Sequence, residues 1–159
     1  MPELILMRHA QALPVTAGAT DFERPLSARG RSAAAQAARR LAAAAIKVER
    51  LLYSPARRTR DTAEIVAQEL SLDAAALEAA PELYAASRRA IRRTIERLHA
   101  DATIVLVVGH NPGISDFGAE LASGLAHEQL PTAGFWRLPF DAGGWQQLTR
   151  RTDAGAASR

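Results

Sequence analysis

The feature that most constrains the fold is the run Thr103–Val108, in which only aliphatic residues follow an initial threonine. A strand that is apolar on both faces must be covered on both faces, as in the middle of a parallel sheet. Glu3–Met7 and Arg50–Tyr53 are further strand candidates, and Leu77–Ala80 is a weaker one. Segments with helical periodicity separate these runs. Strands alternating with helices predict an α/β fold, specifically a three-layer α/β/α sandwich with a mostly parallel central sheet.

Capping residues and apolar spacing predict four helices. The first helix runs from an N-cap at Ser27 to about Ile46. The second runs to about Leu70, with Ser54 as its N-cap and Pro55 as its first helical residue. The third starts at Ser87, and the fourth begins at Asn111-Pro112-Gly113 and runs to about Ala122. Two further runs, Phe135–Phe140 and Trp145–Arg150, predict a terminal hairpin.

Composition narrows the class of protein. The 159 residues are 48% hydrophobic, which suits one domain over residues 1–151, with 152–159 expected to be a disordered tail. Cysteine is absent, which excludes disulfides, a thiolate metal site and a cysteine nucleophile. We found neither a membrane-length apolar run nor the basic start of a signal peptide, so we expect a soluble cytoplasmic protein without a membrane partner. A net charge of +3 is too mild to indicate nucleic acid.

Basic residues follow three of the predicted strands. Arg8-His9 ends the first, Ser54-Pro55 and Arg57-Arg58 follow the second, and Gly109-His110 ends the fourth. Ligands bind outside the carboxyl ends of parallel strands, so we expect these side chains to meet. Two of the segments also begin a helix there, which adds backbone N–H groups. Guanidinium forks match the oxygens of a compact dianion, most simply a phosphoryl group.

Other chemistries fit less well. A metal site would need Asp21 or Glu82 to join His9 and His110, and the neighbouring arginines would repel a cation, so we expect neither metal nor cofactor. Ser54 does not lie in a nucleophile elbow, and the sequence has no glycine-rich phosphate loop. Histidine remains as the nucleophile, with a phosphohistidine intermediate. A neutral imidazole attacks well if a backbone carbonyl holds its other nitrogen.

Each of these features also has an ordinary structural interpretation. A single histidine after a strand is commonly a hydrogen-bonding residue, and Arg57 and Arg58 could form i,i+4 pairs with Asp61 and Thr62. The convergence of three strand ends favours the anion site, because unpaired positive charge at one place is unfavourable without a bound anion.

The motifs resemble those of the histidine phosphatase superfamily, which has the phosphoglycerate-mutase-like fold. Its Arg-His-Gly signature corresponds to Arg8-His9-Ala10, and its Ser-Pro-x-x-Arg-x-x-x-Thr segment runs from Ser54 to Thr62. Its second histidine corresponds to His110, after a hydrophobic strand. The stretch from Asp21 to Gly30, with Arg-Pro-Leu-Ser in its middle, resembles the SixA-type phosphohistidine phosphatases. The similarity covers about residues 3–150.

The resemblance implies a role for each matching residue. His9 would be the nucleophile that becomes phosphorylated. Arg8 and Arg58 would clamp the phosphoryl oxygens, His110 would complete the pocket as a donor, and Arg24 would be an additional phosphate contact.

The chain departs from the family pattern at two points. Ala10 replaces the signature glycine, so the turn after His9 must accommodate a Cβ. In larger relatives, a glutamate after the helix that follows the second arginine serves as the general acid. Glu82 is the nearest candidate for this role. It could equally be a residue that only precedes the next helix. An imidazole leaving group needs less acid assistance than an alkoxide.

The predicted helices and strands use nearly all of the residues between Arg58 and His110. We therefore expect a minimal fold, without the inserted segments that form lids over the site in larger relatives. An open pocket suits phosphohistidine on a protein, such as a histidine phosphotransfer domain, with phosphate as the product. The alternatives are a small-molecule phosphomonoesterase or mutase, and a non-catalytic phosphate-binding module. The arginines between Arg88 and Arg97 could dock an acidic partner or form a solvated face.

Overall fold

A computed structural model describes residues 2–97, 102–139 and 145. Within this part of the chain, five strands form one sheet in the order β3-β2-β4-β1-β5. Their bounds are Glu3–Arg8 for β1, Arg50–Tyr53 for β2, Leu77–Ala79 for β3, Ile104–Gly109 for β4 and Phe135–Pro139 for β5. The first four strands are parallel, and β5 pairs antiparallel with β1 at one edge. The mostly parallel sheet is confirmed.

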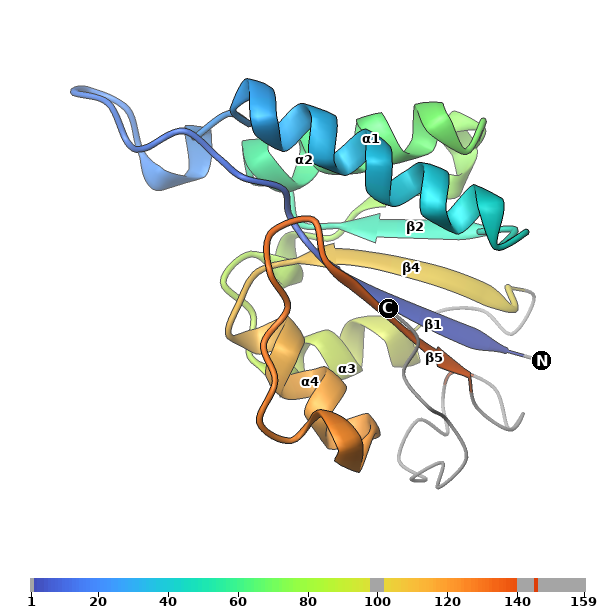
Figure 1. The fold of residues 1–159 in the computed structure, drawn as a ribbon. Helices are drawn as coiled ribbons and strands as arrows, with labels where there is room; N and C mark the ends of the chain where they lie inside the picture. The colour runs from blue at the N-terminus through green and yellow to red at the C-terminus, as the bar shows by residue number, and fades with distance from the viewer. Residues whose placement is uncertain (1, 98–101, 140–144, 146–159) are drawn as a thin grey trace.

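Helices cover both faces of the sheet. They are α1 (Ala28–Ala43), α2 (Arg57–Glu69), α3 (Arg88–Glu96) and α4 (Gly113–Leu121). Figure 1 shows α1 and α2 on one face and α3 and α4 on the other. The three-layer sandwich is therefore confirmed.

The central strand β4 divides its side chains between two apolar cores. Leu106 and Val108 belong to the core cluster that includes α1 and α2 residues, whereas Val105 and Val107 belong to the cluster with α3 and α4 residues. All four side chains are fully buried. Successive side chains of a strand point to opposite faces, so a strand apolar throughout requires helices on both sides.

Two predicted helix ends were wrong. The first helix ends at Ala43 rather than Ile46, because Ala45 adopts a left-handed φ of 56° and the Ile46 N–H bonds to the Leu41 carbonyl. The second helix begins at Arg57 with Ala56 as its N-cap, so Ser54-Pro55 does not start it.

The end of the chain is described only in part. The predicted strand Phe135–Phe140 is found as β5, while the strand predicted over Trp145–Arg150 and the expected tail 152–159 lie outside the described residues, Trp145 excepted. The Trp145 indole is buried and donates to the Ala102 carbonyl at 2.6 Å. None of the helices in the described residues is long and apolar enough to span a membrane.

Candidate active site

The register of the sheet brings the three basic strand ends together. Arg8 lies opposite Gly109, and Tyr53 lies opposite Val108. His9 and His110 therefore leave adjacent strands at the same edge, and their ring centroids are 5.4 Å apart. The predicted convergence is confirmed.

His9 is buried, and its ring has a defined tautomer. Its Nδ1 lies 2.7 Å from the Ala10 carbonyl oxygen, which can only accept, so Nδ1 carries the proton and Nε2 keeps its lone pair. Burial lowers the pKa of His9 to about 4, with a further contribution from Arg58 and Arg8 and against the opposing effect of the Ala10 bond. The ring is neutral at pH 7, as a nucleophile must be.

The turn after His9 is fixed from both sides. The Ala10 N–H donates to Thr62 Oγ1 at 3.0 Å, and that hydroxyl donates to the Arg58 carbonyl at 2.7 Å. The Ala10 methyl is fully buried in a small apolar cluster with Leu26 and Ala34. The Cβ that replaces the signature glycine is thus accommodated by packing, and Thr62 ties the nucleophile to α2.

His110 is also buried and neutral. Arg58 donates an Nη2–H to its Nδ1 at 3.2 Å, so the ring proton is on Nε2, which lies 2.8 Å from Ser54 Oγ. Burial and the Arg58 charge lower the pKa of His110 to about 3. Sequence reasoning missed this role of Ser54, whose hydroxyl had been interpreted as a helix cap.

Arg8 and Arg58, two of the three arginines predicted to bind phosphate, each keep a buried N–H without a partner among the described residues. Arg8 donates from Nη1 to the Leu130 carbonyl at 3.3 Å, and Arg58 donates from Nη1 to the Asp21 carbonyl at 2.9 Å. The Nε–H groups of both arginines are buried without a hydrogen-bond acceptor among the described residues. Burial lowers the pKa of Arg8. A buried donor without an acceptor is costly. The guanidinium charge of both side chains suits an oxyanion ligand.

Asp21 connects the arginines to an aromatic ring. Its Oδ2 accepts from Arg58 Nη2 and from the Tyr84 hydroxyl, both at 3.0 Å, and its Oδ1 accepts from Arg24 at 3.1 Å. Desolvation raises the pKa of Asp21, but the bonds from Arg24, Tyr84 and Arg58 outweigh it and lower the pKa overall. The sequence offers Asp21 as a possible metal ligand and as the start of the SixA-type stretch, but not as the partner of Arg58. The described residues contain no cluster of three groups that could hold a metal.

Arg24 reaches the site from the segment between β1 and α1, which Figure 1 shows extending past the sheet edge. Its Nε donates to the Leu13 carbonyl at 2.8 Å. Its charge contributes to the lowered pKa of His9. Its role as a phosphate contact stays a prediction.

A sequence model of the histidine phosphatase superfamily (branch 1) matches residues 4–85, half of the chain. The chain belongs to the histidine phosphatase superfamily. The structure of the protein histidine phosphatase SixA in complex with tungstate aligns with a TM-score of 0.80 at 26% identity, over 92% of this chain and 90% of that chain. This likeness confirms the predicted fold family and SixA-type resemblance.

Two other relatives extend the comparison. A protein of Picosynechococcus sp., described as uncharacterized, is 34% identical over 141 residues, which cover 83% of this chain and 81% of that protein. The mycobacterial glucosyl-3-phosphoglycerate phosphatase aligns with a TM-score of 0.70 over 92% of this chain and 94% of that chain. At 18% identity it shows a shared fold alone.

In this histidine phosphatase, Glu82 follows β3 at the surface. Its carboxylate accepts from Arg97 at 2.9 Å, and its own backbone N–H and Arg97 lower its pKa. Within the described part of the chain, no hydrogen bond joins Glu82 to His9 or His110. The acid role of Glu82 therefore stays a prediction. A lowered pKa leaves less of the carboxyl group protonated at neutral pH, so less of it has a proton to donate.

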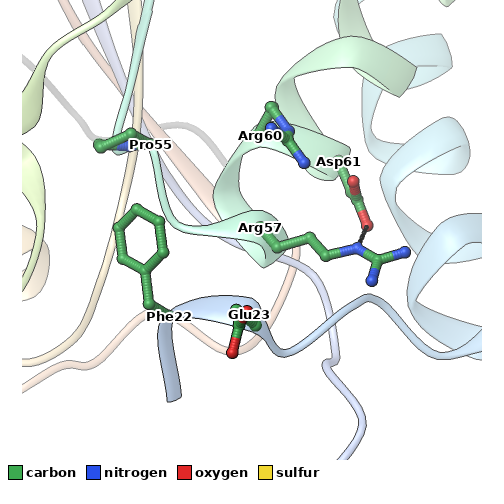
Figure 2. Close-up of a pocket in the computed structure, with 6 residues that line it drawn as sticks. All are labelled: Phe22, Glu23, Pro55, Arg57, Arg60 and Asp61. Atoms are coloured by element: carbon green, nitrogen blue, oxygen red, sulfur yellow. Dashed lines mark ion pairs between the residues drawn. The ribbon is translucent and has the colours of Figure 1, made fainter. Parts of the chain in front are cut away.

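A cavity of about 500 Å³ opens beside the phosphatase site. Figure 2 shows Phe22 under Pro55, across from residues of α2. The lining residues are Phe22, Glu23, Pro55, Arg57, Arg60 and Asp61. Asp61 lies 3.9 Å from Arg57, the expected i,i+4 pair, and 3.6 Å from Arg31.

Proposed function

We propose that this phosphatase hydrolyses phosphohistidine on a protein, through a phospho-His9 intermediate and without a metal. The observation that carries the proposal is the neutral His9 ring, with Nδ1 held by the Ala10 carbonyl, close to the positive charges of Arg58 and Arg8. Phosphoryl transfer needs mainly positioning and neutralisation of charge, and these groups supply both.

In the first step, the Nε2 lone pair of His9 attacks phosphorus, and the bond from phosphorus to the substrate nitrogen breaks. The electron pair of that bond returns to the substrate ring. A phosphohistidine ring protonated on its other nitrogen leaves as neutral imidazole, so no protein acid is required. Arg8 and Arg58 neutralise the equatorial oxygens during transfer.

In the second step, water attacks phospho-His9. A new oxygen–phosphorus bond forms, the bond to Nε2 breaks, and its electron pair returns to the ring. The extra proton of the water leaves to solvent or stays on the product phosphate. His9 regains its starting tautomer because Nδ1 keeps its proton on the Ala10 carbonyl throughout.

The surroundings of Glu82 favour phosphohistidine over an ester. Glu82, the nearest candidate acid, is exposed and paired with Arg97. An alkoxide leaving group would need an acid, whereas an imidazole would not. The alternative, a small phosphomonoester, draws support from the cavity beside the site, where Arg57 and Arg60 could hold the rest of such a substrate.

The test uses a phosphorylated histidine phosphotransfer domain and a panel of sugar phosphates. The wild-type chain should release phosphate from the domain and form an acid-labile phosphoenzyme. The His9→Ala variant should lose both and still bind tungstate, a tetrahedral oxyanion. The matched control is His127→Ala, since His127 is exposed and outside the site.

Three results would count against the proposal. Wild-type turnover by His9→Ala would exclude the phospho-His9 mechanism. Rapid hydrolysis of sugar phosphates with an inert phosphotransfer domain would favour the small-molecule alternative. Oxyanion binding without turnover of any substrate would favour a non-catalytic module.

A further inference from the structure

Aromatic rings lead from the nucleophile to the surface. The His110 ring, 5.4 Å from that of His9, meets the edge of Tyr84 at 5.6 Å, and Tyr84 meets Phe22 edge-on at 5.1 Å. Tyr84 is 37% exposed and Phe22 is 39% exposed. In a chain with only 5% aromatic residues, two exposed rings at the mouth of the site stand out.

Both exposed rings lie close to Asp21, which also binds Arg58. Tyr84 donates its hydroxyl to Asp21 Oδ2, the oxygen that also accepts from Arg58. Phe22 adjoins Asp21 in the short helix Asp21–Glu23. Tyr84 is therefore linked through Asp21 to the guanidinium that would hold the phosphoryl group, and Phe22 contacts the Tyr84 ring.

The rings are also accessible. Phe22 lines the cavity of about 500 Å³ that opens beside the site, and Figure 2 shows its ring at the wall of that cavity. A ring that lines open space offers its surface to a ligand rather than to the core.

We propose that Tyr84 and Phe22 bind the imidazole ring of the phosphohistidine substrate, and so select an aromatic leaving group. This inference rests on the proposed function. In an in-line transfer the leaving group lies on the side of phosphorus opposite His9. Tyr84 and Phe22 extend from beside His110 to the surface, where a protein substrate would present that group. Aromatic rings attract one another edge-to-face at centroid distances of 4.5–7 Å, an interaction that a serine-like or amine leaving group does not offer.

The experiment compares two small P–N compounds that differ in the ring. N-phosphoimidazole carries the ring, and phosphoramidate has the same type of bond without it. The ratio of their kcat/KM values is measured for each variant, so the fraction of active enzyme cancels. In Tyr84→Leu and Phe22→Leu we expect the ratio to fall about three- to tenfold, the size of one aromatic contact.

Two further variants separate the ring from other effects. Tyr84→Phe keeps the ring and removes the hydroxyl that binds Asp21, so its ratio should stay within twofold of wild type. Val15→Ala, an exposed apolar residue elsewhere on the same segment, should leave the ratio unchanged.

An unchanged ratio in both leucine variants would overturn the inference, since the rings would then affect both substrates alike. A drop in Tyr84→Phe as large as in Tyr84→Leu would also overturn it, because the hydroxyl would be responsible. A wild-type chain that hydrolyses neither P–N compound but cleaves a phosphomonoester would instead refute the proposed function, and the inference with it.

Discussion

The site and helix α3 both contain several arginines, but the two groups differ in how many carboxylates balance their charge. On α3, the Arg88 and Arg92 side chains pair with Glu120, and Arg92 lies 4.0 Å from Glu96. At the site, Arg8 has no carboxylate partner among the described residues, and Arg58 shares one with Arg24 and Tyr84.

The balance of charge separates the two groups more clearly than the unpartnered donors do. Arg8 and Arg58 each keep a buried Nε–H without an acceptor. Arg92 also has one buried N–H without an acceptor, but two carboxylates match its charge. Its guanidinium also lies over the Phe117 ring, with the centroid 5.5 Å away. An arginine cluster indicates an anion site when its positive charge is left for a ligand to neutralise.

The largest expected effect tests this contrast directly. Arg58→Ala should lower kcat/KM for phosphohistidine by about 10²–10³-fold, because it removes a charged donor at the phosphoryl group. Arg92→Ala should leave kcat/KM within twofold and lower the free energy of unfolding by about 1–2 kcal/mol, since it removes ion pairs and packing on Phe117. Hydrolysis kinetics and urea unfolding measure the two effects. Similar activity losses in both variants would contradict the distinction.

The convergence of Arg8, His9 and His110 could be predicted because parallel strands end at one edge, and each motif is local in sequence. The hydrogen bond between Asp21 and Tyr84 could not be predicted, because these residues are 63 positions apart and no periodic pattern in the sequence connects them. Ser54 was misinterpreted because a serine before a proline is typical of a helix start, whereas here its hydroxyl meets His110.

The second prediction concerns the stability of the fold in acid. The buried histidines of the site should lower the free energy of unfolding as the pH falls, whereas the paired arginines of α3 should not. His9 has a pKa of about 4 in the folded chain and 6.5 when unfolded, so below pH 6.5 the unfolded state binds the proton first. Stability should therefore fall as the pH drops from 6.5 towards 4, by about 3 kcal/mol for this group. His9→Asn should make that part of the curve less steep in urea unfolding at stepped pH values, and the remaining slope should come from His110, whose pKa is lowered to about 3. A wild-type curve that is flat over the same range would exclude the buried neutral ring.

The third prediction exchanges one carboxylate in each region. Asp21→Asn should lower kcat about tenfold, because Arg58 loses a charged partner that orients it. It should also tighten inhibition by tungstate, because a negative charge that repels the anion is gone. Glu120→Gln on α4 is the matched control, and it should change neither constant. Weaker tungstate inhibition in Asp21→Asn would show that Asp21 does not oppose the anion.

The smallest effect is expected at Glu82, which lies between the two regions. Its carboxylate pairs with Arg97, just past α3, and its pKa is lowered, so it resembles the matched pairs of the surface helix more than the site. Glu82→Gln should therefore change kcat for phosphohistidine less than twofold across pH 6 to 8. If Glu82 were the general acid, Glu82→Gln would instead lower kcat by about 10²-fold or more and remove the alkaline limb of the pH profile.

Arg97→Gln is the control, because it frees the Glu82 carboxylate without removing it. If Glu82 acts as the acid, this variant should keep the activity that Glu82→Gln loses. If both variants behave like wild type, the imidazole leaving group needs no acid from the protein.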